Sequence, residues 1–140
     1  MDWTIEFDKA IEQYLPDLEV LQDEPMSRHT TFRIGGPAKR MAFTSSREQL
    51  VLLMSFAKDY GANPLVIGNG SNLLVPDEGL DRLVIDTSAN LNRVERGSGN
   101  TVLADAGATL ARTADLACKS GLTGLEFAHG IPGTVGGGVC

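Results

Sequence analysis

The sequence is poor in residues that build metal sites and covalent frameworks. It has two cysteines among its 140 residues, Cys118 and Cys140, and neither belongs to a CxxC pair or a cysteine–histidine cluster. This spacing argues against a zinc site and is typical of two reduced thiols inside a cell. We therefore expect no metal ligands and no disulfide.

Long apolar runs are also missing. The longest covers Leu50–Met54, whereas a membrane-spanning helix needs roughly 20 residues. The first residues, MDWTIEFDKAIEQYL, are interrupted by charges and do not resemble a signal peptide. These absences predict a cytoplasmic protein with no membrane partner.

Positive charge is the third shortage. The 12 lysines and arginines are outnumbered by 18 aspartates and glutamates, so the formal net charge is −6. Nucleic-acid binding needs a basic face that displaces counterions from phosphates, and we therefore expect no nucleic-acid partner. An anionic ligand would have to be held locally, by backbone N–H groups and a few placed side chains.

The length and the 42% hydrophobic content suit one globular domain, or one domain with part of another. Residues 2–15 are predicted to form a helix that ends before Pro16, because apolar residues recur at spacings of three and four. These residues share one face: Trp3, Phe7, Ile11, Tyr14 and Leu15. Residues 17–40 lack this period and are rich in turn formers, which predicts an extended connector.

Three strands with one helix between the first two are predicted next, which is typical of a βαβ unit. The strands cover residues 41–45, 64–68 and 82–86, and the second is apolar on both faces, as in a covered parallel sheet. Ser46 and Gln49 have the spacing of a capping box, in which the Gln49 side chain reaches back to the Ser46 amide.

The helix that follows Ser46 is expected to end at Gly61, where a left-handed residue is usual. Its buried face is predicted to hold Leu50, Leu53, Met54 and Ala57.

The pattern changes near residue 90. The segments LNRVER and TVLADA flank residues 97–100 and predict a hairpin. A third helix is expected between Thr109 and Gly121. Its inward residues are predicted to be Leu110, Thr113, Ala114, Ala117 and Cys118. The final GGVC is expected to begin a strand of an unfinished sheet, whose open edge would allow a dimer.

Two glycine-dense loops each adjoin an apolar run. Residues 68–72 (GNGSN) follow a predicted parallel strand, so they are either an anion site for a diphosphate or only a tight turn. They are not a Walker loop, which needs a lysine, nor a Rossmann fingerprint, because Leu73 replaces the third glycine. Residues 130–138 (GIPGTVGGG) suit either a flat aromatic ligand against the backbone or close packing of chain on chain.

Taken in order, four motifs resemble the UDP-N-acetylenolpyruvoylglucosamine reductase family: HTTFRIGGPA (29–38), VIGNGSNLLVPDEG (66–79), ADAGA (104–108) and GLTGLEFAHGIPGTVGGGV (121–139). The resemblance implies an α+β fold, the FAD-binding domain of the vanillyl-alcohol-oxidase (PCMH) type. Its implied parts are an N-terminal helix and connector (1–24), a small parallel βαβ subdomain (25–90) and a truncated antiparallel-sheet subdomain (91–140), with the substrate domain absent.

The resemblance also implies that FAD binds without a covalent link. In this family the first loop wraps the FAD diphosphate, and the second passes beside the flavin and the nucleotide linker. The implied cofactor-binding residues are Ile67, Gly68, Asn69, Gly70, Ser71, Asn72 and Leu73 in the first loop, Ile131, Pro132, Gly133, Thr134, Gly136, Gly137 and Val139 in the second, and Gly107 as a weaker candidate.

The activity implied by the resemblance is that of an NADPH-dependent oxidoreductase of peptidoglycan synthesis, and hence of cell-wall biogenesis, cell shape and cell division. NADPH reduces FAD, and the reduced flavin passes a hydride to the enolpyruvyl group of a UDP-sugar, which gives UDP-N-acetylmuramate. The family's catalytic serine, glutamate and arginine would lie beyond residue 140. We therefore expect no catalytic residue here, no reductase activity from the chain alone and weak FAD binding.

Two alternatives remain open. The chain could be part of another FAD-linked oxidoreductase with the same fold. It could instead be a truncated, non-catalytic domain that binds a nucleotide or associates through its open sheet edge.

Overall fold

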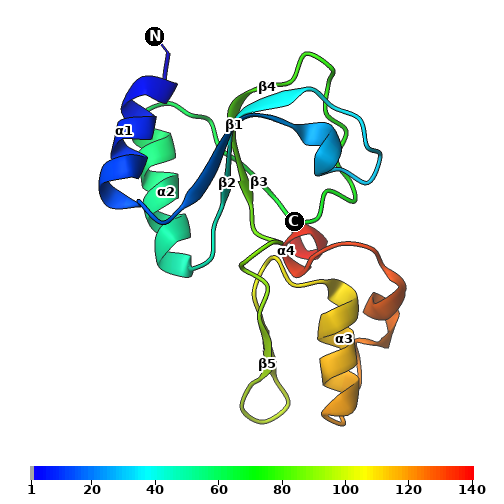
Figure 1. The fold of residues 1–140 in the computed structure, drawn as a ribbon. Helices are drawn as coiled ribbons and strands as arrows, with labels where there is room; N and C mark the ends of the chain where they lie inside the picture. Colours follow the sequence, from blue (N-terminus) through cyan, green and yellow to red (C-terminus); the bar gives the residue numbers. More distant parts are fainter. Residues whose placement is uncertain (1) are drawn as a thin grey trace.

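The computed structural model describes residues 2–140. The helices are α1 (Thr4–Tyr14), α2 (Arg47–Asp59), α3 (Leu110–Lys119) and α4 (Val135–Val139), and the strands are β1 (Glu19–Pro25), β2 (Pro37–Phe43), β3 (Leu65–Ile67), β4 (Leu80–Asp86), β5 (Val94–Arg96) and β6 (Val102–Ala104). Two 3-10 turns cover Met26–Arg28 and Glu126–Gly130. The chain forms two lobes, with α4 between them (Figure 1).

The larger lobe contains a four-stranded sheet in the order β1-β2-β4-β3. Strands β2 and β3 both run parallel to β4, which lies between them, and β1 pairs antiparallel with β2. The prediction of an extended connector over residues 17–40 was wrong, because β1 joins this sheet, and the boundary expected at residue 24 falls inside β1. The strand was missed because β1 lies at the edge of the sheet and its sequence, EVLQDEP, lacks the alternation of apolar and polar residues that marks a half-buried strand.

Each face of the larger sheet has its own core. Helices α1 and α2 cover one face (Figure 1), over a cluster of Phe7, Ile11, Leu15, Leu18, Ala42, Leu53, Ala57, Ala62, Leu83 and Ile85. The other face carries Met26, Ala38, Met41, Ile67, Val75 and Val84. Along β4, Leu83 and Ile85 therefore face the helices and Val84 faces away, as the period of a strand requires.

Three predicted burial positions in this lobe were wrong. Tyr14 is 57% exposed, because its ring lies at the rim of the core beside the Phe56 ring, while the next residue, Leu15, is the one that enters the core. Met54 is 38% exposed on the outer side of α2. Val66 is 48% exposed, because β3 is an edge strand and not a strand covered on both faces.

The predicted cap at the start of α2 and the predicted glycine after its end are both present, with one difference in the capping bonds. The Ser46 hydroxyl accepts the Gln49 amide at 3.1 Å, as predicted. The Gln49 side chain, however, accepts the Ser45 amide at 2.9 Å and not the Ser46 amide. Gly61 has a φ of +72°, which confirms the left-handed residue after the helix.

The smaller lobe contains the predicted antiparallel hairpin β5-β6 and helix α3. The Thr109 hydroxyl caps α3 by accepting the Arg112 amide at 3.1 Å. Cys118 is exposed, contrary to the prediction, and Cys140 is also an exposed free thiol. The strand expected at GGVC was wrong, because Gly137, Gly138 and Val139 belong to α4 and Cys140 is its C-cap; the Thr134 hydroxyl caps the first turn of this helix.

Two wider observations concern residues 2–140 as a whole. None of the helices in this range is long and apolar enough to cross a membrane. The same residues contain no group of three or more histidine, cysteine, aspartate or glutamate side chains that could hold a metal ion.

We expect Asp8→Ala to lower the free energy of unfolding by about 1–3 kcal/mol. Arg40 in β2 is 8% exposed, and two of its guanidinium nitrogens donate to the two Asp8 oxygens of α1 at 2.9 and 2.7 Å. Removing one partner of a buried pair costs about 3–5 kcal/mol, and the partial exposure of Asp8 reduces this cost. Urea denaturation measures the loss.

Asp115→Ala is the matched control, because it breaks the exposed pair of Asp115 with Lys119. Exposed pairs contribute about 0–1 kcal/mol, so this variant should stay near the wild type. If Asp8→Ala and Asp115→Ala lowered the free energy of unfolding equally, the result would contradict the claim that Asp8 stabilises the buried charge of Arg40.

Acid should weaken the attachment of the N-terminal helix. Hydrogen bonds from the Thr4 amide and hydroxyl, with a smaller effect of Lys39, lower the pKa of Asp2 from 3.8 to about 2. A hydrogen bond from Trp3, followed by Lys39, lowers the pKa of Asp81. Because the folded carboxylates bind protons less tightly than the unfolded ones, their stabilisation is present above about pH 4 and is lost as pH falls toward 2.

The urea midpoint should therefore fall between pH 4 and pH 2.5 in the wild type. Asp2→Asn keeps a side-chain acceptor for Thr4 but cannot titrate, so the variant should show a smaller fall over the same interval. An unchanged fall would show that Asp2 does not contribute to the pH dependence.

Candidate functional site

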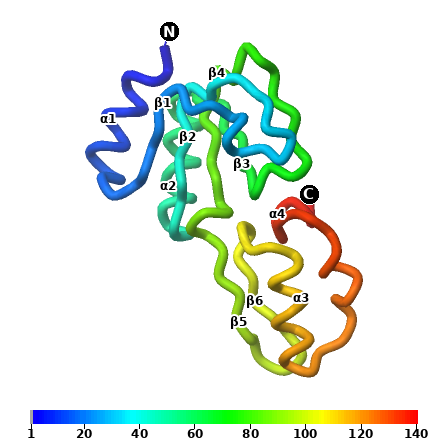
Figure 2. Tube along the Cα trace, turned by 45° about the vertical axis from the view of Figure 1, so that its right-hand side comes forward, coloured from blue at the N-terminus to red at the C-terminus, as the bar shows by residue number. Residues whose placement is uncertain are grey.

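The two glycine loops, far apart in the sequence, meet in the structure. A Cβ atom at Gly68 would overlap the Thr134 hydroxyl and would lie 2.8 Å from its methyl group. A Cβ atom at Gly133 would lie 3.3 Å from the Ser71 hydroxyl oxygen. In Figure 2, α4 lies beside the part of the chain that leaves β3. The contact requires glycine at residue 68 and encloses a groove between the loops.

The groove has a volume of about 590 Å³. It brings together twelve of the fifteen predicted site residues: Ile67, Gly68, Asn69, Gly70, Ser71, Asn72, Leu73, Ile131, Pro132, Gly133, Thr134 and Gly137. Five further residues also line it: Leu65, Val66, Leu110, Gly138 and Cys140. Leu110 reaches the second loop through the hydrogen bond from its amide to the Gly133 carbonyl oxygen, a long-range contact that has no local sequence signal.

Three predicted site residues lie outside the groove. Gly107 is buried at the joint between the lobes, where a Cβ atom would overlap the Thr87 carbonyl oxygen and lie 2.5 Å from that of Leu91. Gly136 packs against Ala106, 3.1 Å from where its Cβ would be. Val139 is 82% exposed. The glycines among these three are needed for close packing of the backbone.

The first loop follows β3 at the carboxyl end of the parallel strands. Gly70 has a φ of +68°, and a Cβ atom there would overlap the His29 carbonyl oxygen. Its own carbonyl oxygen accepts the Thr31 amide at 3.1 Å, which ties the loop to the segment after β1. Among residues 2–140, no protein acceptor receives the backbone N–H groups of residues 68–72. These five consecutive amides therefore have no hydrogen-bond partner within the described chain.

The second loop is anchored to the turn before α3. The Val135 amide donates to the Ala108 carbonyl oxygen and the Gly136 amide to that of Ala106, each at 2.8 Å. Gly133 has a φ of +136°, which a residue with a side chain rarely adopts, and its carbonyl oxygen accepts the Leu110 amide at 3.1 Å. These bonds hold residues 131–134 against the first loop.

The groove is electrically neutral in its side chains. None of the residues that line it is an aspartate, glutamate, lysine or arginine. Its polar side chains are neutral donors and acceptors: Asn69, Ser71, Asn72 and Thr134. In a protein with a net charge of −6, this composition removes the nearest sources of repulsion for an anion.

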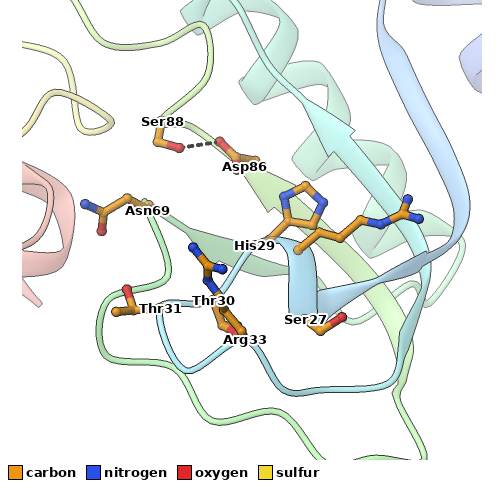
Figure 3. A pocket seen from close by; sticks show the side chains of 10 residues that line it. Ser27, His29, Thr30, Thr31, Arg33, Asn69, Asp86 and Ser88 are labelled. Atoms are coloured by element: carbon orange, nitrogen blue, oxygen red, sulfur yellow. Dashed lines mark hydrogen bonds between the residues drawn. The ribbon is translucent and has the colours of Figure 1, made fainter.

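A second cavity, of about 680 Å³, adjoins the start of the first loop (Figure 3). Gly68 and Asn69 line both this cavity and the groove. The other lining residues are Ser27, Arg28, His29, Thr30, Thr31, Arg33, Asp86 and Ser88. Sequence reasoning missed this cavity, because the segment after β1 carries no periodic signal and reaches the loop through the long-range bond from Thr31 to Gly70.

Asp86 is the one acidic residue in the lining of this second cavity. It is 5% exposed, and one of its oxygens accepts the Ser88 hydroxyl at 2.9 Å and the Ala89 amide at 3.0 Å. Figure 3 shows the bond between Asp86 and Ser88 at the edge of the cavity. Asp86 therefore holds the turn after β4.

Comparison with known protein families matches residues 38–140 to the family described as "FAD binding domain". Curated relatives named UDP-N-acetylenolpyruvoylglucosamine reductase include one from Moorella thermoacetica, 49% identical over 122 residues (87% of this chain and 40% of the relative). Another, from Caldicellulosiruptor bescii, is 45% identical over 130 residues (91% and 41%). The chain thus spans about two fifths of the length of these relatives.

Solved structures agree on the fold. The crystal structure of UDP-N-acetylenolpyruvylglucosamine reductase from Thermus caldophilus superposes with a TM-score of 0.60 at 33% identity, over 87% of this chain and 41% of that one. Cholesterol oxidase from B. sterolicum superposes with a TM-score of 0.55 at 16% identity, over 75% and 21%, and shows the fold alone. These likenesses confirm the predicted α+β fold of the FAD-binding type, with a parallel and an antiparallel sheet.

Proposed function

Since this chain belongs to the FAD binding domain family, we propose that its two glycine loops hold FAD without a covalent bond. The observation that carries the proposal is the row of five free backbone amides at residues 68–72, in a groove without a charged side chain. Consecutive amides in a turn with a left-handed glycine form a concave anion site. A diphosphate matches such a site better than a carboxylate, because it offers several oxygens along one line.

The residues present fit the rest of the cofactor. The groove volume of about 590 Å³ lies within the range of roughly 300–1,000 Å³ that is common for small-molecule sites. Leu65, Leu110, Ile131 and Pro132 give it an apolar side, while the first loop gives it a polar one. This division suits a ligand with a flat apolar ring system and a charged linker, and the lining contains no histidine that could form a covalent link.

We further propose that the chain is the FAD-binding part of a peptidoglycan-synthesis oxidoreductase located in the cytoplasm. Support comes from relatives 45–49% identical that carry the reductase name. The whole enzyme would use NADPH and act on a UDP-sugar with an enolpyruvyl group. FAD supplies the hydride-transfer chemistry when bound. The part played by these 140 residues is to bind the diphosphate, orient the flavin and exclude water from the groove.

An absorption spectrum tests the binding proposal. Purified chain is mixed with FAD, unbound cofactor is removed on a desalting column, and the visible flavin bands are recorded. Retained bands with a protein-induced shift support a site that is already assembled. Bovine serum albumin treated in the same way shows how much FAD passes through the column without specific binding. Flavin bands no stronger than in that control would contradict FAD binding tight enough to survive desalting. Added NADPH and substrate should give no turnover with this chain alone.

A further inference from the structure

An arginine in a strained backbone conformation lies beside the proposed diphosphate site. Three residues other than glycine have a positive φ among residues 2–140: Asp23, Arg33 and Asn63. Aspartate and asparagine often adopt this conformation, whereas arginine rarely does. Arg33 has a φ of +55°. Strain of this kind persists where the surrounding structure enforces it, and often where a side chain has a task.

The turn that carries Arg33 is firmly built. The Arg33 amide donates to the Thr30 carbonyl oxygen at 3.1 Å, and the Thr30 hydroxyl donates to the Ile34 carbonyl oxygen at 3.1 Å. The next contact, from the Thr31 amide to the Gly70 carbonyl oxygen, ties the turn to the first glycine loop. The position of Arg33 is therefore fixed relative to the free amides of residues 68–72.

Figure 3 shows the Arg33 guanidinium group within the second cavity, in the space between Asn69 and His29. The same cavity is lined by Gly68 and Asn69, the first two residues of the loop. An anion bound at the amides of Gly68 and Asn69 would therefore border the cavity that contains the Arg33 guanidinium group.

The charge of Arg33 is not used by the protein itself. Within the described part of the chain, no carboxylate lies within 4.0 Å of its nitrogens, whereas Arg28 and His29 both approach Glu24. Asp86 accepts hydrogen bonds from Ser88 and its neighbouring turn. In an acidic chain where the other arginine of the cavity, Arg28, has a carboxylate partner, Arg33 remains as an available positive charge.

We propose that Arg33 is the side chain that supplies positive charge to the ligand's diphosphate, while the loop amides supply neutral hydrogen bonds. A guanidinium group can donate two parallel hydrogen bonds to one phosphate, and charge-assisted bonds of this kind are stronger than neutral ones. The inference rests on the proposed FAD site and names the group that selects a nucleoside diphosphate over an uncharged flavin.

The test compares three probes with the purified chain by isothermal titration: FAD, ADP and riboflavin, which has no phosphate. Arg33→Asn removes the charge and keeps a residue that tolerates a positive φ, so the fold should survive, as the urea midpoint will verify. The dissociation constants for FAD and ADP should rise roughly tenfold, since charge-assisted hydrogen bonds are strong but the exposure of Arg33 to water weakens them. The value for riboflavin should not change.

Two further variants sharpen the result. Arg33→Lys keeps the charge and should retain most of the FAD affinity. Arg28→Gln removes a cation that lines the same cavity but lies near Glu24, and it should change affinity less than twofold. In 0.5 M NaCl the difference between the wild type and Arg33→Asn should shrink, because salt screens an exposed charge.

Equal affinities of the wild type and Arg33→Asn for FAD and ADP would overturn the inference, as would an equal loss of riboflavin binding. The proposed function fails separately if the wild type binds ADP but not FAD, and the ADP titration then still decides the role of Arg33. A wild type that binds neither nucleotide would overturn both.

Discussion

Gly68→Ala should weaken FAD binding roughly 10- to 100-fold. The added methyl group would overlap the Thr134 hydroxyl and lie 3.0 Å from the Thr134 Cβ atom, so the two loops would have to separate. Overpacking of this kind costs about 1–3 kcal/mol, and every 1.4 kcal/mol changes an affinity tenfold. Quenching of flavin fluorescence during titration with protein measures the dissociation constant.

Gly130→Ala is the matched control, because it lies in the second loop, has no positive φ and would meet nothing within 4 Å. Its affinity for FAD should stay close to that of the wild type. Thr134→Ala in the Gly68→Ala background removes the two atoms that overlap most and should restore part of the affinity. Additive effects of the two substitutions would contradict a direct contact between the loops.

Gly107→Ala should destabilise the fold by about 3 kcal/mol, at the upper end of the usual range for overpacking. The new Cβ atom would overlap the Thr87 carbonyl oxygen and lie 2.5 Å from the Leu91 carbonyl oxygen. Both obstacles are backbone atoms of the segment that joins β4 to the hairpin, so no side-chain rotation relieves the clash. The urea midpoint of unfolding measures the loss.

If Gly107→Ala does not fold well enough for urea denaturation, limited proteolysis of the expressed chain measures the loss of structure instead. Gly107→Ser would not help, because its Cβ atom would meet the same backbone atoms. Cleavage between β4 and β5 should become much faster than in the Gly130→Ala control. A midpoint equal to that of the control would show that Gly107 does not hold the two lobes together.

Local chemistry made much of this molecule predictable. Ser46 and Thr109 both cap helices as their positions indicate, and Gly61 takes the left-handed conformation that ends α2. The hairpin β5-β6 follows directly from the turn residues between its strands. These features depend on residues a few positions apart, which is the range over which a sequence pattern carries physical information.

Features that depend on distant contacts were not predictable. Strand β1 exists because β2 offers an edge, and the order β2-β4-β3 depends on where β4 inserts. The GGVC segment continues a helical turn whose first amides, those of Val135 and Gly136, donate to Ala108 and Ala106 and which the Thr134 hydroxyl caps. None of these contacts is visible in the composition of GGVC itself. Glycines favour neither state strongly, so context decides.

The site shows the same division. The two loops were identified from their glycine content and from the resemblance, and the groove brings most of their residues together. The second cavity depends on the bond from Thr31 to Gly70 and on a left-handed Arg33. Neither has a sequence signature, because arginine is not expected at a positive φ.

An amide NMR titration of the ¹⁵N-labelled chain with FAD tests most directly whether residues 68–72 bind the diphosphate, because it detects weak as well as tight binding. We expect saturable shifts of the amide signals of residues 68–72, joined by those of residues 131–134, with ADP reproducing the changes in the first loop. Saturable shifts elsewhere in the chain, with the signals of residues 68–72 unmoved, would contradict the claim that these five amides bind the diphosphate.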